Sequence, residues 1–337
     1  MTVKIAISGA GYIGHIHAQA IQNTPDAEVA ALVDYDAAKC RAFSEKFGIS
    51  RCYASVEDLL KDGGVDGLVI GIPNAYHAPQ TLAALEAGVA VMVEKPMAMN
   101  SAEAGRMLEM SHKKKVPLMV AHCWRFDEEV NWLKKQVVDG TLGRILRTKG
   151  YGVHANWGPS GWFTQKSLAG GGAMADMGIH ALDTTRYVLG DPEPVSVYAR
   201  IGTYYIQGDV DDTGVVLVNW DNDAVSYIET GWWQPHMDGP EAATQLYGTK
   251  GFAQIFPTRA EIPNPQEQRV DVVDPGYVYP RPEHCPQVMY DRQMAHFVEC
   301  IEKGLTPNPG GLEGLTNMEI VDAAYESART GKVVFID

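Results

Sequence analysis

Basic residues are scarce in this sequence. Its 337 residues include 28 Lys and Arg against 42 Asp and Glu, which gives a formal net charge of −14. Proteins that bind nucleic acids or anionic membrane surfaces use a basic face. We therefore expect neither partner, although a small anion held in a locally basic pocket remains compatible with this composition.

Cysteine is also scarce, and its spacing is irregular. The five cysteines are odd in number and form no CxxC pair (Cys40, Cys52, Cys123, Cys285 and Cys300). We expect reduced thiols in a cytoplasmic protein, with neither a disulfide framework nor a zinc site. The histidines show no metal-ligand spacing either, so no metal is expected.

Long apolar runs and a signal-peptide pattern are absent as well. The sequence enters directly into an apolar run at residues 3–8, and no apolar stretch is long enough to span a bilayer. We expect no membrane association. Hydrophobic residues still make up 45% of the chain, enough for sizeable cores, and the length favours two domains.

Short apolar runs alternate with helix-like segments over residues 1–122. The apolar runs, often rich in Val and Ile, lie at residues 3–8, 28–34, 65–72, 89–95 and 116–122. Segments with helical spacing separate them, at residues 15–23, 35–48, 78–88 and 101–115. Strands that alternate with helices indicate βαβ units. The pattern predicts an α/β domain built on a doubly wound parallel sheet.

The pattern changes in residues 123–337. Strand-like runs follow one another at residues 194–202, 213–221, 224–233, 242–248 and 251–257. The turn sequences DNDA and GTKG between them indicate hairpins, and hence an antiparallel sheet with one face to be covered. Helical segments at residues 288–304 and 312–331 are candidates to cover or flank that sheet. The proline-rich stretch 262–286 is expected to form a long surface loop.

A glycine-rich turn follows the first predicted strand. Gly9, Gly11 and Gly14 form a GxGxxG motif that opens a helix, and Asp34 stands 20 residues after Gly14, at the end of the next strand. In dinucleotide-binding folds the first glycine makes the tight turn, the second lets the backbone approach the pyrophosphate, and the third lets helix and strand pack closely. The helix N-terminus binds the phosphates. The predicted cofactor contacts here are Gly9, Gly11, Tyr12, Ile13, Gly14 and Asp34.

Asp34 also bears on which dinucleotide is used. A carboxylate at this position accepts hydrogen bonds from both ribose hydroxyls of NAD and repels the 2′-phosphate of NADP. We therefore predict NAD as the cofactor, with NADP as the alternative.

Two further polar groups stand just past predicted strands. Pro73, Asn74 and His77 follow one strand, and Glu94 and Lys95 follow the next. Ligands bind at the carboxyl edge of such sheets, so all five are predicted cofactor contacts. Each group has an alternative. Asn74 and His77 also suit the cap of a helix, and a lysine at a strand end is often only a surface residue.

Residues 169–180 read AGGGAMADMGIH, with three successive glycines ahead of Asp176 and His180. Glycine costs conformational entropy on folding, so the run indicates a need for close backbone approach. The spacing of the acid and the imidazole places both on one face if a helix follows. A site is one interpretation, and a loop followed by a helix-surface pair is the other.

The order of these motifs resembles the Gfo/Idh/MocA family, which comprises glucose-fructose oxidoreductase, inositol dehydrogenase and related sugar and polyol oxidoreductases. The resemblance covers essentially the whole chain. Its two most specific motifs, EKP at Lys95 and GGGxxxDxGxH at Asp176 and His180, are intact. It implies a Rossmann domain over residues 1–122 and an α+β substrate-binding domain over residues 123–337. The large, open, mostly antiparallel sheet of such a domain often mediates homodimers or homotetramers.

The resemblance also implies roles for single residues. Lys95 resembles the lysine at the junction of cofactor and substrate, and Asp176 and His180 resemble the acid and the acid/base imidazole. We expect these three to be catalytic and to contact the substrate. Arg125, in AHCWRF, resembles an arginine carried toward the substrate, with a salt bridge as the alternative. Trp162 is a candidate to stack on a sugar face, against a place in the core or a subunit interface.

The expected activity is that of an NAD(P)-dependent oxidoreductase. It would move a hydride between nicotinamide and a carbinol or carbonyl carbon of a sugar, inositol or related polyol. His180 would take the hydroxyl proton, and Lys95 would stabilise negative charge on the reacting oxygen. Two alternatives stay open: glycoside cleavage by oxidation, elimination and reduction on a tightly held NAD, and a non-catalytic NAD(P)-binding sensor. The intact Lys95, Asp176 and His180 speak against the sensor.

Overall fold

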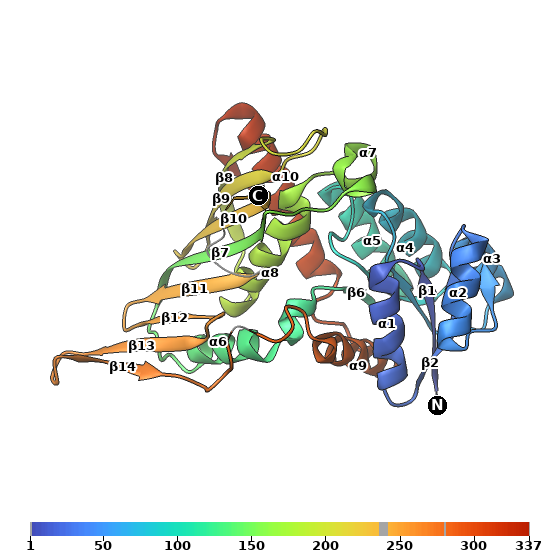
Figure 1. Cartoon of the computed structure of the whole chain (residues 1–337), viewed down its shortest axis with the longest axis horizontal. Helices are drawn as coiled ribbons and strands as arrows, with labels where there is room; N and C mark the ends of the chain where they lie inside the picture. The colour runs from blue at the N-terminus through green and yellow to red at the C-terminus, as the bar shows by residue number, and fades with distance from the viewer. Residues whose placement is uncertain (1, 236–241, 280, 337) are drawn as a thin grey trace. The chain divides into compact units, whose positions relative to one another are not determined.

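The computed structural model describes residues 2–235, 242–279 and 281–336 (Figure 1). The chain divides into two compact units. The first unit is Met1–Cys123 with Pro286–Met318, and the second unit is Trp124–Cys285 with Glu319–Asp337. The division expected from the sequence, 1–122 and 123–337, differs in one segment, because residues 286–318 pack with the first unit.

The first unit contains a parallel sheet of six strands in the order β3-β2-β1-β4-β5-β6. The strands are β1 (Val3–Ser8), β2 (Ala27–Val33), β3 (Cys52–Tyr53), β4 (Gly67–Ile70), β5 (Ala90–Val93) and β6 (Leu118–Val120). Strands β4, β5 and β6 are buried throughout, as both faces of such a sheet are covered. The predicted doubly wound parallel sheet is confirmed. The strand order reverses between β1 and β4, where ligands bind in open α/β sheets.

Helices cover this sheet. They are α1 (Tyr12–Asn23), α2 (Ala37–Phe47), α3 (Val56–Asp62), the short η1 (Asn74–Tyr76), α4 (His77–Glu86), α5 (Ser101–Lys114) and α9 (Gln287–Lys303). Helix α9 packs on α1, and its Phe297 lies against Gly67 of β4. The expectation that residues 288–304 cover or flank the second sheet is therefore wrong. Their helical spacing indicated a buried face but not the sheet that buries it.

The second unit contains a mixed sheet of nine strands in the order β14-β13-β12-β11-β7-β10-β9-β8-β15. The strands are β7 (Ile145–Ala155), β8 (Pro194–Gly202), β9 (Thr213–Trp220), β10 (Val225–Gln234), β11 (Ala243–Gly248), β12 (Phe252–Gln254), β13 (Arg259–Asn264), β14 (Arg269–Val273) and β15 (Val334–Phe335). Strands β7 and β10 pair in parallel, and the other neighbours are antiparallel. The predicted mostly antiparallel sheet is confirmed.

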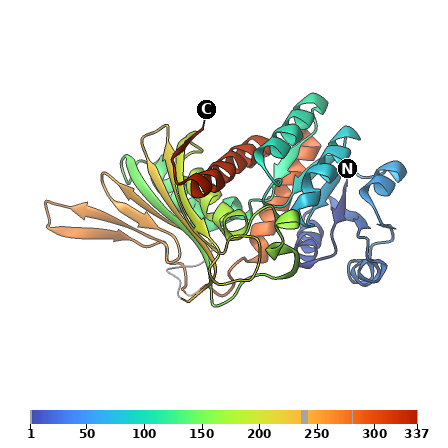
Figure 2. The same ribbon diagram turned by 90° about the horizontal axis from the view of Figure 1, so that it is seen from above.

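One face of the second sheet packs on helices. These are α6 (Glu128–Val138), α8 (Ile179–Val188) and α10 (Gly311–Thr330), and the boundary between the units falls within α10. Figure 2 shows α10 against one side of the sheet. Side chains alternate along β9, where Val216 and Val218 are buried while Leu217 between them is 37% exposed. The short elements η2 (Cys123–Phe126), η3 (Gly161–Thr164), α7 (Lys166–Ala169) and η4 (Met174–Gly178) complete the fold.

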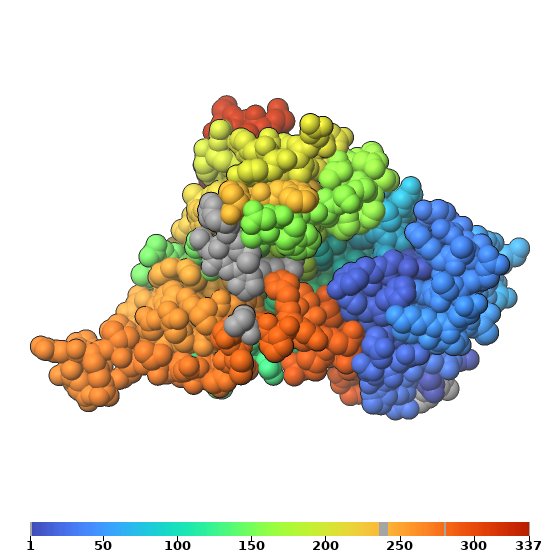
Figure 3. Space-filling view, in the orientation of Figure 1, coloured from blue at the N-terminus to red at the C-terminus, as the bar shows by residue number. Residues whose placement is uncertain are grey.

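The stretch 262–286 is not a single surface loop, contrary to the sequence-based expectation. Its first residues complete β13, and residues 269–273 form β14, so the two strands make a hairpin that extends to one side in Figures 1 and 3. Val270 and Val272 are exposed at this sheet edge. Prolines on both sides of residues 269–273 favoured a loop, but this valine-rich run itself contains no proline and pairs with β13 as an edge strand. Pro280, within the same stretch, lies outside the described residues.

A disulfide joins Cys40 of α2 to Cys52 of β3, so the expectation of reduced thiols is wrong for this pair. The two Cα atoms lie 6.5 Å apart, within the range that a disulfide spans. Their separation in sequence gave no recognisable motif, because the pairing arises from the packing of α2 beside β3. The cytoplasmic location, which rested on the cysteine pattern together with the lack of a signal-peptide pattern and of a membrane-spanning run, stays a prediction.

None of the helices formed by the described residues combines the length and the apolar character that crossing a bilayer requires.

Candidate functional site

The three glycines of the turn in the first unit differ in the space that a side chain would find at each position. Gly9 has a φ of 108°, and a Cβ there would collide with the carbonyl oxygen of Gly71. A Cβ at Gly14 would collide with the carbonyl oxygen of Gly9. At Gly11, apart from the glycine and its two chain neighbours, no atom of a described residue lies within 4 Å of the Cβ position. The protein's own packing leaves space at Gly11, which fits the close approach of a dinucleotide.

The helix after this turn leaves its N-terminal amides for a ligand. Helix α1 begins at Tyr12, and its first turn holds no acidic side chain. Among the described residues, no side chain caps the amides that follow Gly11. Amides at a helix N-terminus attract anions, helped by the helix dipole. The start of α1 therefore suits a pyrophosphate, and Tyr12 and Ile13 lie in its first turn.

Asp34 follows β2 with its carboxylate fixed in place. Its Oδ2 accepts a hydrogen bond from the amide of Ala10, and its Oδ1 accepts one from the amide of Asp36, both at 2.9 Å. The bond to Ala10 holds the carboxylate beside the glycine turn. Each oxygen keeps a second lone pair. The group is oriented and can still accept hydrogen bonds from two ribose hydroxyls.

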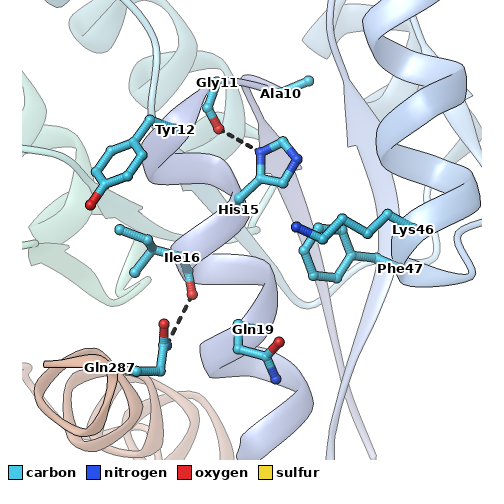
Figure 4. A pocket seen from close by; sticks show the side chains of 9 residues that line it. All are labelled: Ala10, Gly11, Tyr12, His15, Ile16, Gln19, Lys46, Phe47 and Gln287. Carbon is cyan, nitrogen blue, oxygen red and sulfur yellow. Dashed lines mark hydrogen bonds between the residues drawn. The ribbon is translucent and has the colours of Figure 1, made fainter.

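A pocket of about 560 Å³ adjoins the turn (Figure 4). It is lined by Ala10, Gly11, Tyr12, His15, Ile16, Gln19, Lys46, Phe47 and Gln287. His15 bonds the carbonyl oxygen of Gly11 through Nδ1 at 2.9 Å, and its ring packs edge-on against Phe47. Lys46 extends from α2 toward α1 and supplies a positive charge to the rim. The pocket thus runs from the proposed phosphate position along the outer side of α1.

His77 holds two parts of the first unit together. Its Nδ1 bonds the carbonyl oxygen of Pro96 at 2.8 Å, and its Nε2 bonds that of Ile72 at 2.9 Å. Burial lowers the pKa of His77, against the two carbonyl oxygens, which favour the protonated ring. A neutral ring donates to only one of these carbonyl oxygens. His77 thus lies between the turn after β4 and the segment after β5, and its contact with a cofactor stays a prediction. Asn74, three residues before His77 at the start of η1, is also buried.

Glu94 of the EKP motif pairs with a residue that the sequence did not single out. The Nε2 of His17 and the Oε1 of Glu94 are 2.7 Å apart, and His17 is fully buried in α1. The Oε2 of Glu94 accepts the amide of Lys95 at 3.2 Å. This pair links the helix of the glycine turn to the backbone of Lys95. The only sequence signal for His17 was its position on the buried face of α1.

In the second unit, Asp176 and His180 lie on one continuous helix. It starts at Ala173, passes through the π-helical stretch Met174–Gly178 and continues as α8. Such stretches are frequent at functional sites. The Nε1 of Trp232 donates to the Oδ2 of Asp176 at 3.0 Å, and His180 is buried. This geometry is not that of an exposed surface pair.

The glycines before this helix serve the packing of the second unit itself. A Cβ at Gly171 would collide with the hydroxyl of Tyr325, and one at Gly172 with the carbonyl oxygen of Asp211. The sequence predicted close backbone approach at this run. The observed approach is to α10 and to the segment before β9.

Arg125 is committed to an internal ion pair. Its guanidinium bonds the carboxylates of Asp183 and Asp191, each at 2.8 Å, and the side chain is 1% exposed. Burial by itself would lower the pKa of Arg125, but the two carboxylates outweigh it and raise the pKa. These contacts match the salt-bridge alternative, and we do not include Arg125 in the site proposed below.

Trp162 stacks on Phe163, with ring centroids 3.9 Å apart, and stays partly exposed. One indole face is therefore used within the second unit. Its role as a sugar platform stays a prediction.

The predicted site residues are distributed over both units of the chain. Glu94 and Lys95 belong to the first unit, and Asp176 and His180 belong to the second. Over residues 2–235, 242–279 and 281–336, no group of three or more His, Cys, Asp or Glu side chains gathers in a way that could hold a metal ion.

Comparison with known proteins identifies the family. Residues 3–122 match the model of the oxidoreductase family with an NAD-binding Rossmann fold, and residues 130–254 match the GFO/IDH/MocA C-terminal domain. The chain belongs to the Gfo/Idh/MocA oxidoreductase family. Its first unit is an NAD-binding Rossmann domain.

Individual relatives extend over the whole chain. D-glucoside 3-dehydrogenase of Escherichia coli (strain K12) is 29% identical, over 98% of this chain and 96% of that protein. scyllo-Inositol 2-dehydrogenase (NAD(+)) of Bacillus subtilis (strain 168) is 26% identical, over 99% and 96%. The solved structure of levoglucosan dehydrogenase in complex with NADH superposes with a TM-score of 0.89 over 100% of both chains, at 23% identity. This last likeness concerns the fold.

Proposed function

We propose that this protein is an NAD-dependent dehydrogenase that oxidises a carbinol of a sugar, inositol or related polyol, or reduces the corresponding carbonyl. Membership of the oxidoreductase family supports the reaction class. The names of the dehydrogenases that resemble the chain support the substrate class. The observation that carries the proposal is the helix on which Asp176, bonded by Trp232, and His180 both lie. The same chain has Lys95, whose amide is bonded by Glu94, and Glu94 in turn bonds His17 on the helix after the glycine turn.

The roles follow from the side chains. The nicotinamide of bound NAD supplies the hydride acceptor. His180 accepts the proton of the substrate hydroxyl, because an imidazole titrates near neutral pH, and returns it when the carbonyl is reduced. The ammonium of Lys95 donates a hydrogen bond to the reacting oxygen and stabilises its negative charge. Asp176 orients the substrate from a position fixed by Trp232.

NAD is proposed over NADP on the geometry of Asp34. Its oriented carboxylate would accept bonds from both hydroxyls of the adenosine ribose. The same charge repels a 2′-phosphate. The start of α1 and the open position at Gly11 would hold the pyrophosphate.

A substrate panel tests the proposed function. Sugars, inositols and their keto forms are incubated with each cofactor, and reduced nicotinamide is followed at about 340 nm. We expect net NADH formation with at least one free sugar or polyol, and slower reaction with NADP. A chain that binds NAD tightly but reduces none of it, while cleaving a glycoside, would instead be a redox-neutral glycosidase. No turnover on any substrate class would contradict both activities.

The open face of the second sheet supports a homodimer or homotetramer. It carries Leu217 on β9 opposite Tyr227 on β10, beside an ion pair between Lys149 and Glu229. Large exposed apolar patches are rare on monomers, and most homo-oligomers are closed by twofold axes.

Light scattering tests this assembly. We expect a mass at least twice the 36.8 kDa of one chain. Leu217→Glu should lower it, because the substitution places a charge in the middle of the face. Leu312→Glu, at an exposed leucine of the first unit, is the matched control. A parental chain that stays at the monomer mass at micromolar concentration would contradict the proposal.

A further inference from the structure

The helix that carries Asp176 and His180 receives its N-terminal cap from a distant part of the chain. Ala173, at its N-cap position, has no side chain that can accept a hydrogen bond. The carboxylate of Asp211 takes that place. Its Oδ1 accepts the amide of Gly172, and its Oδ2 accepts the amide of Met174, both at 2.8 Å. A carboxylate that binds the first free amides of a helix stabilises that end and fixes where the helix begins.

A second side chain holds the carboxylate. The hydroxyl of Tyr325, on α10, donates to the Oδ1 of Asp211 at 2.8 Å. Asp211 itself is 6% exposed. Burial raises the pKa of Asp211, while the bonds from Met174, Tyr325 and Gly172 act against it. Burial and the charge of Asp211 raise the pKa of Tyr325, so its hydroxyl stays a donor.

The contact continues to the backbone of Asp176. The amide of Asp176 donates to the carbonyl oxygen of Gly172 at 3.0 Å, so Gly172 binds Asp211 through its N–H and Asp176 through its C=O. The amide of Ala173 donates to the carbonyl oxygen of Asp211 at 2.8 Å as well. Because Gly172 has no room for a side chain, this segment has little freedom to shift.

We propose that Asp211 and Tyr325 are positioning residues for catalysis: together they fix the start of the π-helical stretch and so the places of Asp176 and His180. The proposal rests on the proposed function, in which those two residues act on the substrate. Neither Asp211 nor Tyr325 touches the reacting atoms in this assignment. Their effect passes through Gly172 and the helix.

Three variants test the proposal. Asp211→Asn removes the charge, and Tyr325→Phe removes only the hydroxyl. Ser327→Ala is the matched control, because Ser327 lies on the same helix as Tyr325 but its hydroxyl bonds Ala199 and Lys332 instead of Asp211. We expect kcat to fall about 10- to 100-fold in Asp211→Asn, since a misplacement of about 1 Å costs that much. A smaller fall is expected in Tyr325→Phe, and none in Ser327→Ala. The Kd for NAD should not change in any of them.

Hydrogen exchange gives a readout that does not need a substrate. Amides of residues 172–180 should exchange faster in Asp211→Asn and Tyr325→Phe than in the parent, and at the parental rate in Ser327→Ala. If Asp211→Asn does not fold, Tyr325→Phe still decides. Parental exchange at residues 172–180 in the hydroxyl variant, or a loss of kcat no greater than in Ser327→Ala, would overturn the proposal. Inactivity of the parent on every substrate would instead contradict the proposed function.

Discussion

Two glycine-rich turns stand at the start of a helix, one in each unit, and the structure uses them in opposite ways. At the first, the position of Gly11 is open and the amides of α1 have no side-chain cap among the described residues. At the second, Tyr325 and Asp211 fill the space beside Gly171 and Gly172, and the carboxylate of Asp211 occupies the free amides.

The difference teaches how to interpret such a turn. A glycine run before a helix indicates close approach, but the approaching group is either a ligand or the protein itself. What decides is whether an acid from elsewhere in the chain already satisfies the helix N-terminus. The first turn is therefore suited to binding an anion. The second holds a helix in place so that side chains farther along it can act.

The two largest expected effects come from substituting His180 and Lys95, which should impair turnover but not NAD binding. His180→Ala should lower kcat by about 10²- to 10⁴-fold, the usual contribution of general acid–base catalysis, while the Kd for NAD stays the same. Steady-state kinetics and a NAD titration measure the two quantities. His112→Ala, at an exposed histidine on α5, should match the parent. Near-parental turnover in His180→Ala would exclude it as the proton acceptor.

Lys95→Ala should reduce kcat at least as much, because it also removes the charge near the reacting oxygen. The losses of Lys95→Ala and His180→Ala should not add in the double variant if the two residues act as one unit. The same kinetic assay measures all three variants. Full additivity, or normal turnover without Lys95, would remove the lysine from the mechanism.

Replacing one glycine from each turn by alanine tests the comparison of the two turns directly. Gly172→Ala should destabilise the fold by about 1–3 kcal/mol, because its Cβ meets the backbone of Asp211. Gly11→Ala should leave the denaturation midpoint unchanged but weaken NAD binding about tenfold or more, since the methyl group enters the ligand's space. Urea unfolding and NAD titration distinguish the two. The reverse pattern would mean that the roles of the turns have been misassigned.

Asp34→Ser should weaken NAD binding about 10- to 100-fold, since a hydrogen bond to a charged group contributes about 1.5–3 kcal/mol. NADP binding should be unaffected or improve. Titration of each variant with both cofactors measures the ratio. Asp36→Ser is the control. Because Asp36 caps α2, this substitution should change the stability of the fold but not the affinity for either cofactor. Tighter binding of NADP than NAD by the parent would contradict the cofactor assignment.

The smallest effect concerns pH. Burial lowers the pKa of His77 below its ordinary value of 6.5, so the neutral ring is favoured in the folded state. The unfolded chain binds a proton at His77 more readily than the folded protein does. The folded state therefore keeps its full stability above pH 6.5, and its free energy of unfolding decreases as the pH falls from there through the folded pKa, by up to about 1.4 kcal/mol per pH unit. Denaturant melts at several pH values measure it. His77→Gln should flatten this dependence, and an unchanged slope would mean that another group causes it.

Much of the fold was visible in the sequence. The alternation in residues 1–122 predicted the parallel sheet, and the turns DNDA and GTKG predicted hairpins that the structure contains between β9 and β10 and between β11 and β12. These features are local. The pairing of Cys40 with Cys52, the strand β14 and the place of α9 were missed. Each of them depends on which neighbour a segment meets in space.

The candidate site divides in the same way. Lys95, Asp176 and His180 stand in motifs, so the sequence pointed to them. His17 was missed because its partner Glu94 lies 77 residues away. Asp211 was missed because the amide of Met174 that it caps lies 37 residues earlier. Spacing reveals residues that share a helix, but a contact between distant segments leaves no periodic signal.

The first unit is interrupted in the sequence, and this has a consequence for its synthesis. Its strands and first helices leave the ribosome early, but α9, which packs on α1, follows only after all but the last strand of the second unit's sheet has been made. Until then the apolar surface that Met289, Met294 and Phe297 help to bury lacks its cover. The nascent chain thus carries an unfinished dinucleotide domain through most of translation, a period in which chaperone binding or aggregation competes with folding.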